Sequence, residues 1–267
     1  MTVASSRIVM MQRLGRLAVL VGLAAVGVTA VQYYKRGADL LPPPLMAEKP
    51  VVMPDGSALY VQKYEVTIAE WNGCHAAGAC NQVLKSQAGK PDDRMPATGL
   101  SYVDVGEYLL WISEATGHDF RLPTLPEWQY MAAEVLPEEP DPIFTSPELT
   151  WASAYLTAPQ TKRTLREQGT FATTSQGIVD LNGSVWEWTS ECYAGASNGY
   201  ITPDRCPAFF LGGEHVAAMS FLERDPARGG CAVGVPPAHL GMRLVSDRAP
   251  GLHRRRDQTG GAKPQIN

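Results

Sequence analysis

DLNGSVWEW, residues 180–188, is the stretch of this 267-residue chain that constrains its fold most strongly. Two tryptophans flank Glu187, and aromatic rings of this size usually pack in a protein core. A carboxylate between buried rings needs a positive partner, because an unpaired charge is costly away from water. Arg121 and Arg243, each beside apolar residues, are the candidates. We therefore expect a core segment built around a buried ion pair.

Local motifs around this segment predict a loop-rich α+β domain with two main helices. Capping boxes mark three helix starts, at Thr67-x-x-Glu70, Ser101-x-x-Asp104 and Thr124-x-x-Glu127. Asp55-Gly56 between apolar stretches is typical of a hairpin turn. Short apolar runs separated by glycine suggest small strands in the last third of the chain. The 25 glycines and 21 prolines favour turns and loops elsewhere.

The formal net charge of −4 hides an uneven distribution of charge along the chain. Residues 1–36 carry five basic side chains and no acidic one, and residues 248–267 have a net charge of +4. Residues 37–247 between them carry 13 basic and 26 acidic side chains, a net charge of −13. A body this acidic repels phosphate backbones, so we expect no nucleic-acid partner.

The N-terminal segment predicts export. Residues 17–31 are uncharged, follow three arginines and precede Lys35-Arg36. They form either a cleaved signal peptide or a transmembrane anchor, the latter if the apolar stretch is extended to residues 15–34. In both cases the rest of the chain lies outside the cytoplasm, in the periplasm or beyond. The expected organisation is a signal or anchor, a Pro-rich linker, a main domain and a basic disordered tail, over residues 1–36, 37–49, 50–247 and 248–267.

Export would place the five cysteines in an oxidising space. Cys74 and Cys80 are too far apart along one continuous helix to be bridged, so we expect the helix to end between them and the two to form a disulfide. Among Cys192, Cys206 and Cys231, any two could pair. A zinc site is the less favoured alternative, because the sequence has no C-x-x-C pair or nearby histidine cluster.

Five motifs in this order resemble the formylglycine-generating-enzyme family, the sulfatase-modifying factors. They are Tyr64-Glu65-Val66-Thr67, Arg121-Leu122-Pro123-Thr124, the 180–188 stretch, Gly212-Gly213 and Gly241-Met242-Arg243. The resemblance covers about residues 50–246. It implies a C-type-lectin-like fold with little regular secondary structure.

The resemblance does not extend to the catalytic copper site. In catalytic members, two cysteines after a Gly-Gly-Ser segment bind Cu(I) and support the O2-dependent oxidation of a substrate cysteine. Soft thiolates suit Cu(I), and the matching positions here are Ala217 and Leu222. We therefore expect neither formylglycine-generating activity nor a catalytic copper ion. A different metal site could use His215, Met219 and Cys231, whose side chains carry nitrogen or sulfur ligands.

The resemblance also implies a structural calcium ion. In the family, the glutamate that matches Glu187 and neighbouring backbone carbonyls bind Ca2+, a cation that prefers oxygen ligands. Ser184 stands where the family usually has asparagine, and its hydroxyl is a poorer ligand. Calcium at Glu187 and Ser184 is thus the alternative to the buried ion pair.

These observations together predict an exported pseudoenzyme that serves as an accessory or maturation factor for another exported protein. The family holds its peptide along the segment matching residues 212–222, and the residues expected to line that groove are Trp151, Glu214, His215, Met219 and Phe221. With export, residues 229–243 resemble the accessory proteins of copper nitrite reductases. The alternatives are a copper- or iron-dependent oxidase of cysteine or other sulfur compounds and a lectin-like glycan binder. An uncleaved N-terminal segment would add a membrane contact.

Overall fold

The computed structural model describes residues 40–87, 89–136, 143, 164–193, 206–215, 217–226, 231–233 and 237–251. The chain divides into two compact units, residues 1–41 and 42–267, and the architecture below is that of the second. The expected signal or anchor lies outside the described residues, as does most of the basic tail. None of the helices in the described ranges is long and apolar enough to cross a membrane.

Three helices begin at the three predicted capping boxes. They are α2 (Ile68–Ala76), α3 (Tyr102–Thr116) and α4 (Leu125–Ala132). At each start a serine or threonine hydroxyl accepts the N–H of the residue three positions on, whose carboxylate accepts the N–H of the capping residue in return. Gly117 ends α3 in the left-handed conformation, with φ of 63°. The predictions for the helix starts are therefore confirmed.

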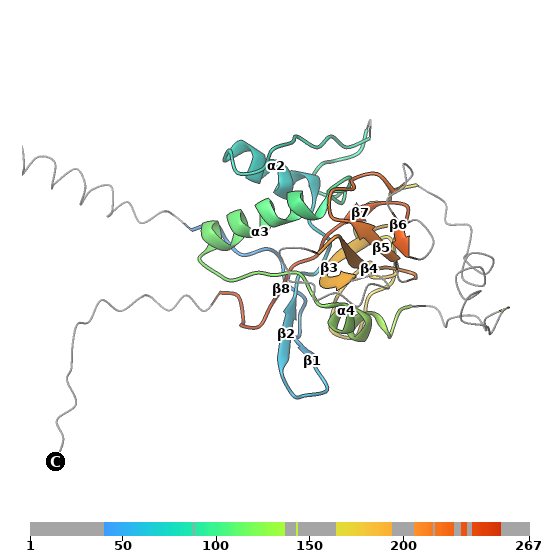
Figure 1. The fold of residues 1–267 in the computed structure, drawn as a ribbon. Coiled ribbons are helices and arrows are strands. Elements are labelled where there is room, and N and C mark those ends of the chain that lie inside the picture. The colour runs from blue at the N-terminus through green and yellow to red at the C-terminus, as the bar shows by residue number, and fades with distance from the viewer. Residues whose placement is uncertain are drawn as a thin grey trace, which may run out of the picture. The chain divides into compact units, whose positions relative to one another are not determined.

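The strands form two small sheets. One has the order β1-β2-β8 and the other the order β6-β5-β4-β3-β7 (Figure 1). Their bounds are β1 Val51–Val52, β2 Ala58–Val61, β3 Trp186–Tyr193, β4 Ala208–Gly212, β5 Ala217–Ser220, β6 Cys231–Val233, β7 Leu240–Gly241 and β8 Val245–Ser246. The pairing of β3 with β7 is parallel, and the other pairings are antiparallel. The hairpin predicted at Asp55-Gly56 joins β1 to β2, and Gly56 takes the positive φ of 85° that its turn requires.

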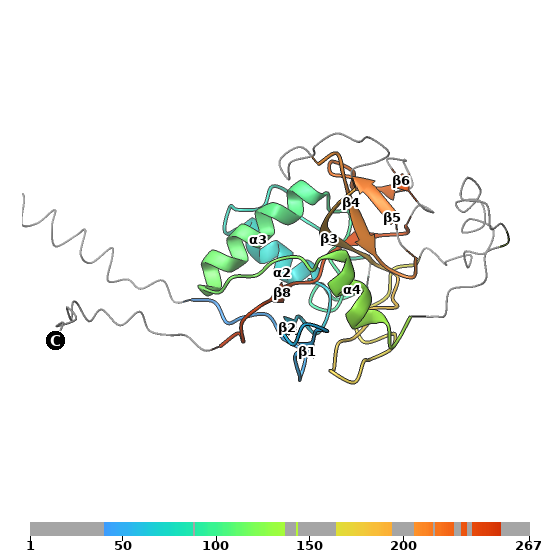
Figure 2. The same cartoon turned by 60° about the horizontal axis from the view of Figure 1, so that its bottom comes forward.

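Aromatic side chains fill the space between these elements. Trp71, Trp128, Trp186 and Trp188 are all fully buried, which confirms the core position predicted for the last two. Trp71 on α2 stacks on Tyr108 of α3, with ring centroids 5.7 Å apart. Helices α2 and α3 lie side by side, while α4 packs on β3 and β4 (Figure 2). The result is the loop-rich α+β fold expected from the sequence.

Candidate functional site

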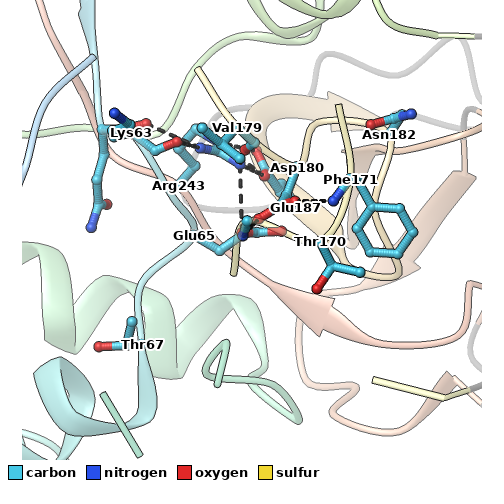
Figure 3. Close-up of polar contacts among 12 residues, drawn as sticks. Lys63, Glu65, Thr67, Thr170, Phe171, Val179, Asp180, Asn182, Glu187 and Arg243 are labelled. Atoms are coloured by element: carbon cyan, nitrogen blue, oxygen red, sulfur yellow. Dashed lines mark hydrogen bonds and ion pairs between the residues drawn. The ribbon is translucent and has the colours of Figure 1, made fainter. Parts of the chain in front are cut away.

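The centre of the domain holds a buried ion pair between Arg243 and Glu187 (Figure 3). Glu187 lies on β3, and its Oε1 accepts hydrogen bonds from Nε and Nη2 of Arg243 at 3.0 and 2.8 Å. Neither side chain is more than 1% exposed. Of the two arginines that the sequence offered as partners, the structure selects Arg243. Arg121 instead binds Glu127 at 2.7 Å and also contacts Asp247, in a network that is partly open to solvent.

The guanidinium of Arg243 also binds backbone carbonyls from two other segments. Nη1 donates to the carbonyl oxygens of Gln62 and Lys63 at 3.0 and 2.8 Å, and Nη2 donates to that of Val179 at 2.9 Å. With the two bonds to Glu187, all five N–H groups of the side chain have acceptors. Arg243 therefore fastens the end of β2 and the loop at residue 179 to β3.

Glu65 brings a second carboxylate to the same arginine. Its Oε2 lies 3.7 Å from Nη2 of Arg243 and has no hydrogen-bond partner in the described part of the chain. Burial raises the pKa of Glu65 to about 8, and the nearby charges of Glu187 and Asp180 add to the rise, although Arg243 opposes it. Glu65 is therefore largely protonated near neutral pH.

Asp180 organises the turn before β3 in the 180–188 motif. It has a positive φ of 67°, and its carboxylate accepts the backbone N–H groups of Gly169 and Phe171 (Figure 3). The side chain of Asn182 accepts the N–H of Ala172 at 3.1 Å. These polar residues of the motif hold the preceding loop in place.

The residues around Glu187 do not fit the calcium ion that the resemblance implies. Arg243 and the indole N–H of Trp128, at 2.7 Å, already occupy both carboxylate oxygens. The Ser184 hydroxyl accepts the backbone N–H of Arg166 at 3.4 Å. A second cation would have to displace a guanidinium or lie against it. The hydrogen bonds of Glu187 therefore lead us to expect no calcium ion at this site, and chelation can test that expectation.

The two positions of the family's copper cysteines differ sharply in burial. Ala217, at the start of β5, is completely buried opposite Leu211 of β4. Leu222 follows β5 and is 64% exposed. The segment around Leu222 is tied to α3, because Arg224 binds the carboxylate of Asp104 through two hydrogen bonds of 2.7 and 2.6 Å.

The Gly-Gly motif before this segment is explained by close packing. A Cβ atom on Gly212 would lie 2.0 Å from the indole of Trp128, and one on Gly213 would lie 2.4 Å from that of Trp186. Only glycine allows the backbone to approach the rings this closely. The motif thus has a structural cause at this site.

The residues expected to line the family groove differ in their burial. Glu214 and His215 lie in the turn between β4 and β5, where the His215 ring is 5.1 Å from that of Trp186. Met219 is fully buried in the core, and Phe221 is partly buried against it. Met219 is therefore a core residue in this structure rather than a groove residue. Trp151 lies outside the described residues.

The structure places two residues of the alternative metal site, Met219 and Cys231, on neighbouring strands. Strand β6 places the backbone of Cys231 opposite Met219. Within the described ranges, no group of three or more His, Cys, Asp or Glu residues is arranged to hold a metal ion.

Two disulfides are present in the domain. The predicted bridge between Cys74 and Cys80 is formed, with Cα atoms 5.4 Å apart, and α2 ends between the two residues as expected. Cys192 and Cys206 form the second bridge, with Cα atoms 5.8 Å apart. Because four of the five cysteines form disulfides, their thiols cannot bind zinc, and Cys231 is the remaining cysteine.

A cavity beside the start of α2 was not indicated by the sequence. Its volume is about 170 Å3, and it is lined by Ile68, Leu84, Lys85, Ser86, Gln87, Met95, Thr98, Leu165 and His239. These residues come from five separate parts of the chain and share no motif. The one local signal was the extended character of residues 81–87, which is faint because only Val83 and Leu84 are apolar.

The fold and its centre define a class of protein, a loop-rich α+β domain held together by one buried arginine and the W-E-W strand. Residues 19–248 match the family described as sulfatase-modifying factor enzyme 1-like domain. The chain therefore belongs to this family, and it is a divergent member because the two copper-cysteine positions hold other residues.

Three solved structures are similar to the chain at low sequence identity. Treponema denticola variable protein 1 is 15% identical, with a TM-score of 0.46, and the match covers 76% of this chain and 93% of that one. For PvdO from Pseudomonas aeruginosa the values are 18%, 0.46, 77% and 92%. For CarF they are 17%, 0.44, 70% and 85%. No curated protein matches the chain.

Proposed function

We propose that the chain is an exported, non-catalytic member of the family that acts as an accessory or maturation factor for another exported protein. This proposal rests on which residues occupy the two positions that hold the copper-binding cysteines in catalytic members of the family. Ala217 is fully buried and Leu222 is an exposed aliphatic residue, so neither supplies a thiolate for Cu(I). Without those thiolates, the oxidation of a substrate cysteine by the family's mechanism has no metal centre.

The disulfides support the exported location. Disulfides persist in oxidising compartments and are rare where the cytosol keeps thiols reduced. The uncharged N-terminal segment with its preceding arginines supports the same location. Whether that segment is cleaved or anchors the chain can be decided by N-terminal sequencing of the mature protein.

The resemblance of residues 229–243 to accessory proteins of copper nitrite reductase gives a narrower form of the proposal. In this form the partner is a copper nitrite reductase. Deletion of the gene should then lower nitrite reductase activity in the source organism, and supply of the full chain should restore it. Unchanged activity in the deletion strain would exclude the narrower form and leave the general one in place.

Capture of the partner tests the general proposal. The full chain carrying a C-terminal affinity tag is expressed in the source organism, cross-linked in intact cells and purified for mass spectrometry. We expect strong enrichment of one exported protein over a tagged unrelated exported control. Absence of any enriched exported protein would count against an accessory role.

A parallel assay examines the enzymatic alternative. The purified full chain is incubated with Cu(I), O2 and a cysteine-containing peptide, and peptide mass reports any oxidation to formylglycine. We expect none. Turnover together with stoichiometric copper or iron that is lost in His215→Ala would replace the accessory proposal with the metal-dependent oxidase.

A further inference from the structure

Residues 81–87 form an extended segment beside α2. Exposed and half-buried side chains alternate along all seven positions, although the segment belongs to neither sheet. A period of two is typical of an extended chain, in which successive side chains point to opposite faces. Val83, for example, is 53% exposed, whereas Leu84 packs against the core.

A side chain from α2 pairs with this segment as a neighbouring strand would. The amide of Asn72 donates to the carbonyl of Leu84 and accepts its N–H, both at 3.0 Å. In an extended chain the backbone groups of one residue point to one edge and those of its neighbours to the other. The backbone groups of Val83 and Lys85 therefore point away from Asn72. Neither residue forms a hydrogen bond with another residue of the described ranges, so this edge is open.

The same segment forms one wall of the cavity of about 170 Å3. Four apolar side chains contribute to the lining, those of Ile68, Leu84, Met95 and Leu165. Apolar cavities of roughly 150 Å3 can hold a molecule the size of benzene. The cavity is thus large enough for one aliphatic side chain.

Lys85 provides the one formal charge among the cavity-lining residues, with histidine counted as neutral. Lys85 is an exposed residue and has no ion-pair partner in the described part of the chain. The nearby cations Lys90 and Arg94, by contrast, are both paired with Glu167. An acidic group of a ligand would therefore form an ion pair with Lys85.

On the basis of the proposed accessory function, we propose that residues 81–87 bind an extended segment of the exported partner as an added strand. The peptide backbone hydrogen-bonds to Val83 and Lys85, one aliphatic side chain enters the cavity, and an acidic side chain pairs with Lys85. Strand addition derives affinity from main-chain hydrogen bonds and specificity from pockets and charges beside the edge. The site is lined by none of the residues 212–222.

Peptide binding to the full chain tests this inference. The probes are fluorescent octapeptides of serine and threonine with blocked ends, which carry one leucine and one glutamate at every relative spacing. Fluorescence anisotropy should show binding confined to a few spacings. Lys85→Glu should weaken the best peptide at least tenfold. The matched variant Lys49→Glu, at an exposed lysine that is not among the cavity-lining residues, should change its affinity less than twofold.

Two further probes separate strand addition from simple charge attraction. Replacement of the peptide's glutamate by lysine should restore binding to the Lys85→Glu variant. N-methylation of alternate peptide amides should abolish binding, because it removes the hydrogen-bond donors. Failure of every peptide to bind, equal affinity for wild type and Lys85→Glu, or insensitivity to N-methylation would each overturn the inference.

Capture of the partner distinguishes failure of this inference from failure of the proposed function. If Lys85→Glu captures the partner as well as the wild type does, residues 81–87 are not the docking edge and the accessory function stands. If neither chain captures an exported protein, the accessory function itself fails. Capture by the wild type with at least tenfold loss in Lys85→Glu supports both.

Discussion

Replacement of Arg243 by methionine should come close to unfolding the domain. The substitution keeps an apolar stem of similar length and removes the guanidinium between Glu187 and three backbone carbonyls. Removal of one partner from a buried ion pair costs about 3–5 kcal/mol. Each carbonyl left without a donor adds roughly 1 kcal/mol, and these contributions are not strictly additive. A loss of about 6 kcal/mol is comparable to the whole stability of many domains, about 5–15 kcal/mol.

Urea unfolding followed by tryptophan fluorescence measures this loss, because four tryptophans are fully buried. Thermal unfolding should agree, with a Tm lowered by roughly 12–24 °C for a domain of this size. Arg121→Met is the matched control. The side chain of Arg121 is 35% exposed, so the loss of its ion pairs should cost about 1 kcal/mol or less. If Arg243→Met is no more harmful than Arg121→Met, the guanidinium does not hold the core together.

Four further predictions concern charge, packing, thiols and metal. For Glu65→Gln, the free energy of unfolding should vary less with pH than it does for the wild type. Burial raises the pKa of Glu65 from 4.5 to about 8, so the folded state holds the proton more tightly than the unfolded state does. The stability of the wild type therefore falls as pH rises from about 4.5 to about 8. The difference, up to roughly 1 kcal/mol per pH unit, is measured by urea titrations at successive pH values, and parallel curves would contradict it. Gly212→Ala should lower the free energy of unfolding by about 3 kcal/mol or more, because the added methyl group would overlap the indole ring of Trp128. Gly106→Ala adds a methyl group in open space on α3 and should stabilise the domain by roughly 0.5–1 kcal/mol. Similar Tm values for the two variants would refute the packing argument. Thiol titration in denaturant should find one thiol per chain, that of Cys231, and three or more would contradict the two bridges. Chelation of divalent cations should leave the Tm unchanged, because both oxygens of Glu187 already have protein donors, and a Tm that falls and recovers with added Ca2+ would show that calcium binds.

The helix starts and the first hairpin could be predicted because their causes are local. Each capping box joins residues three positions apart, and the turn at Gly56 depends on one backbone conformation. The Cys74–Cys80 bridge is similar, since a helix end within six residues is enough to allow it. Such features depend on a few residues close together in the sequence and little on the rest of the chain.

The sequence alone could not predict which arginine pairs with Glu187 or where Met219 lies, because both depend on tertiary structure. Arg121 and Arg243 have the same charge and similar sequence surroundings, and strand pairing decides which of them reaches the centre. Met219 has a sulfur that could bind a metal, yet β5 lies inside a five-stranded sheet and the side chain is buried. The other side of residues 81–87 is held by Trp71 and Asn72 of α2, an arrangement that depends on tertiary structure.

The position of Arg243 in the chain also determines when the domain can fold. Its guanidinium binds the carbonyl of Gln62 across a separation of 181 residues, and β2 likewise pairs with β8 near the end of the domain. A ribosome adding about 5–20 residues per second needs roughly 10–40 s to make that length of chain. During this interval Glu65 and the end of β2 have no internal cation and no closing strand, so the N-terminal third cannot complete its core. The chain thus stays open until its last tenth is made, and a chain cut short before residue 243 should be a substrate for proteases.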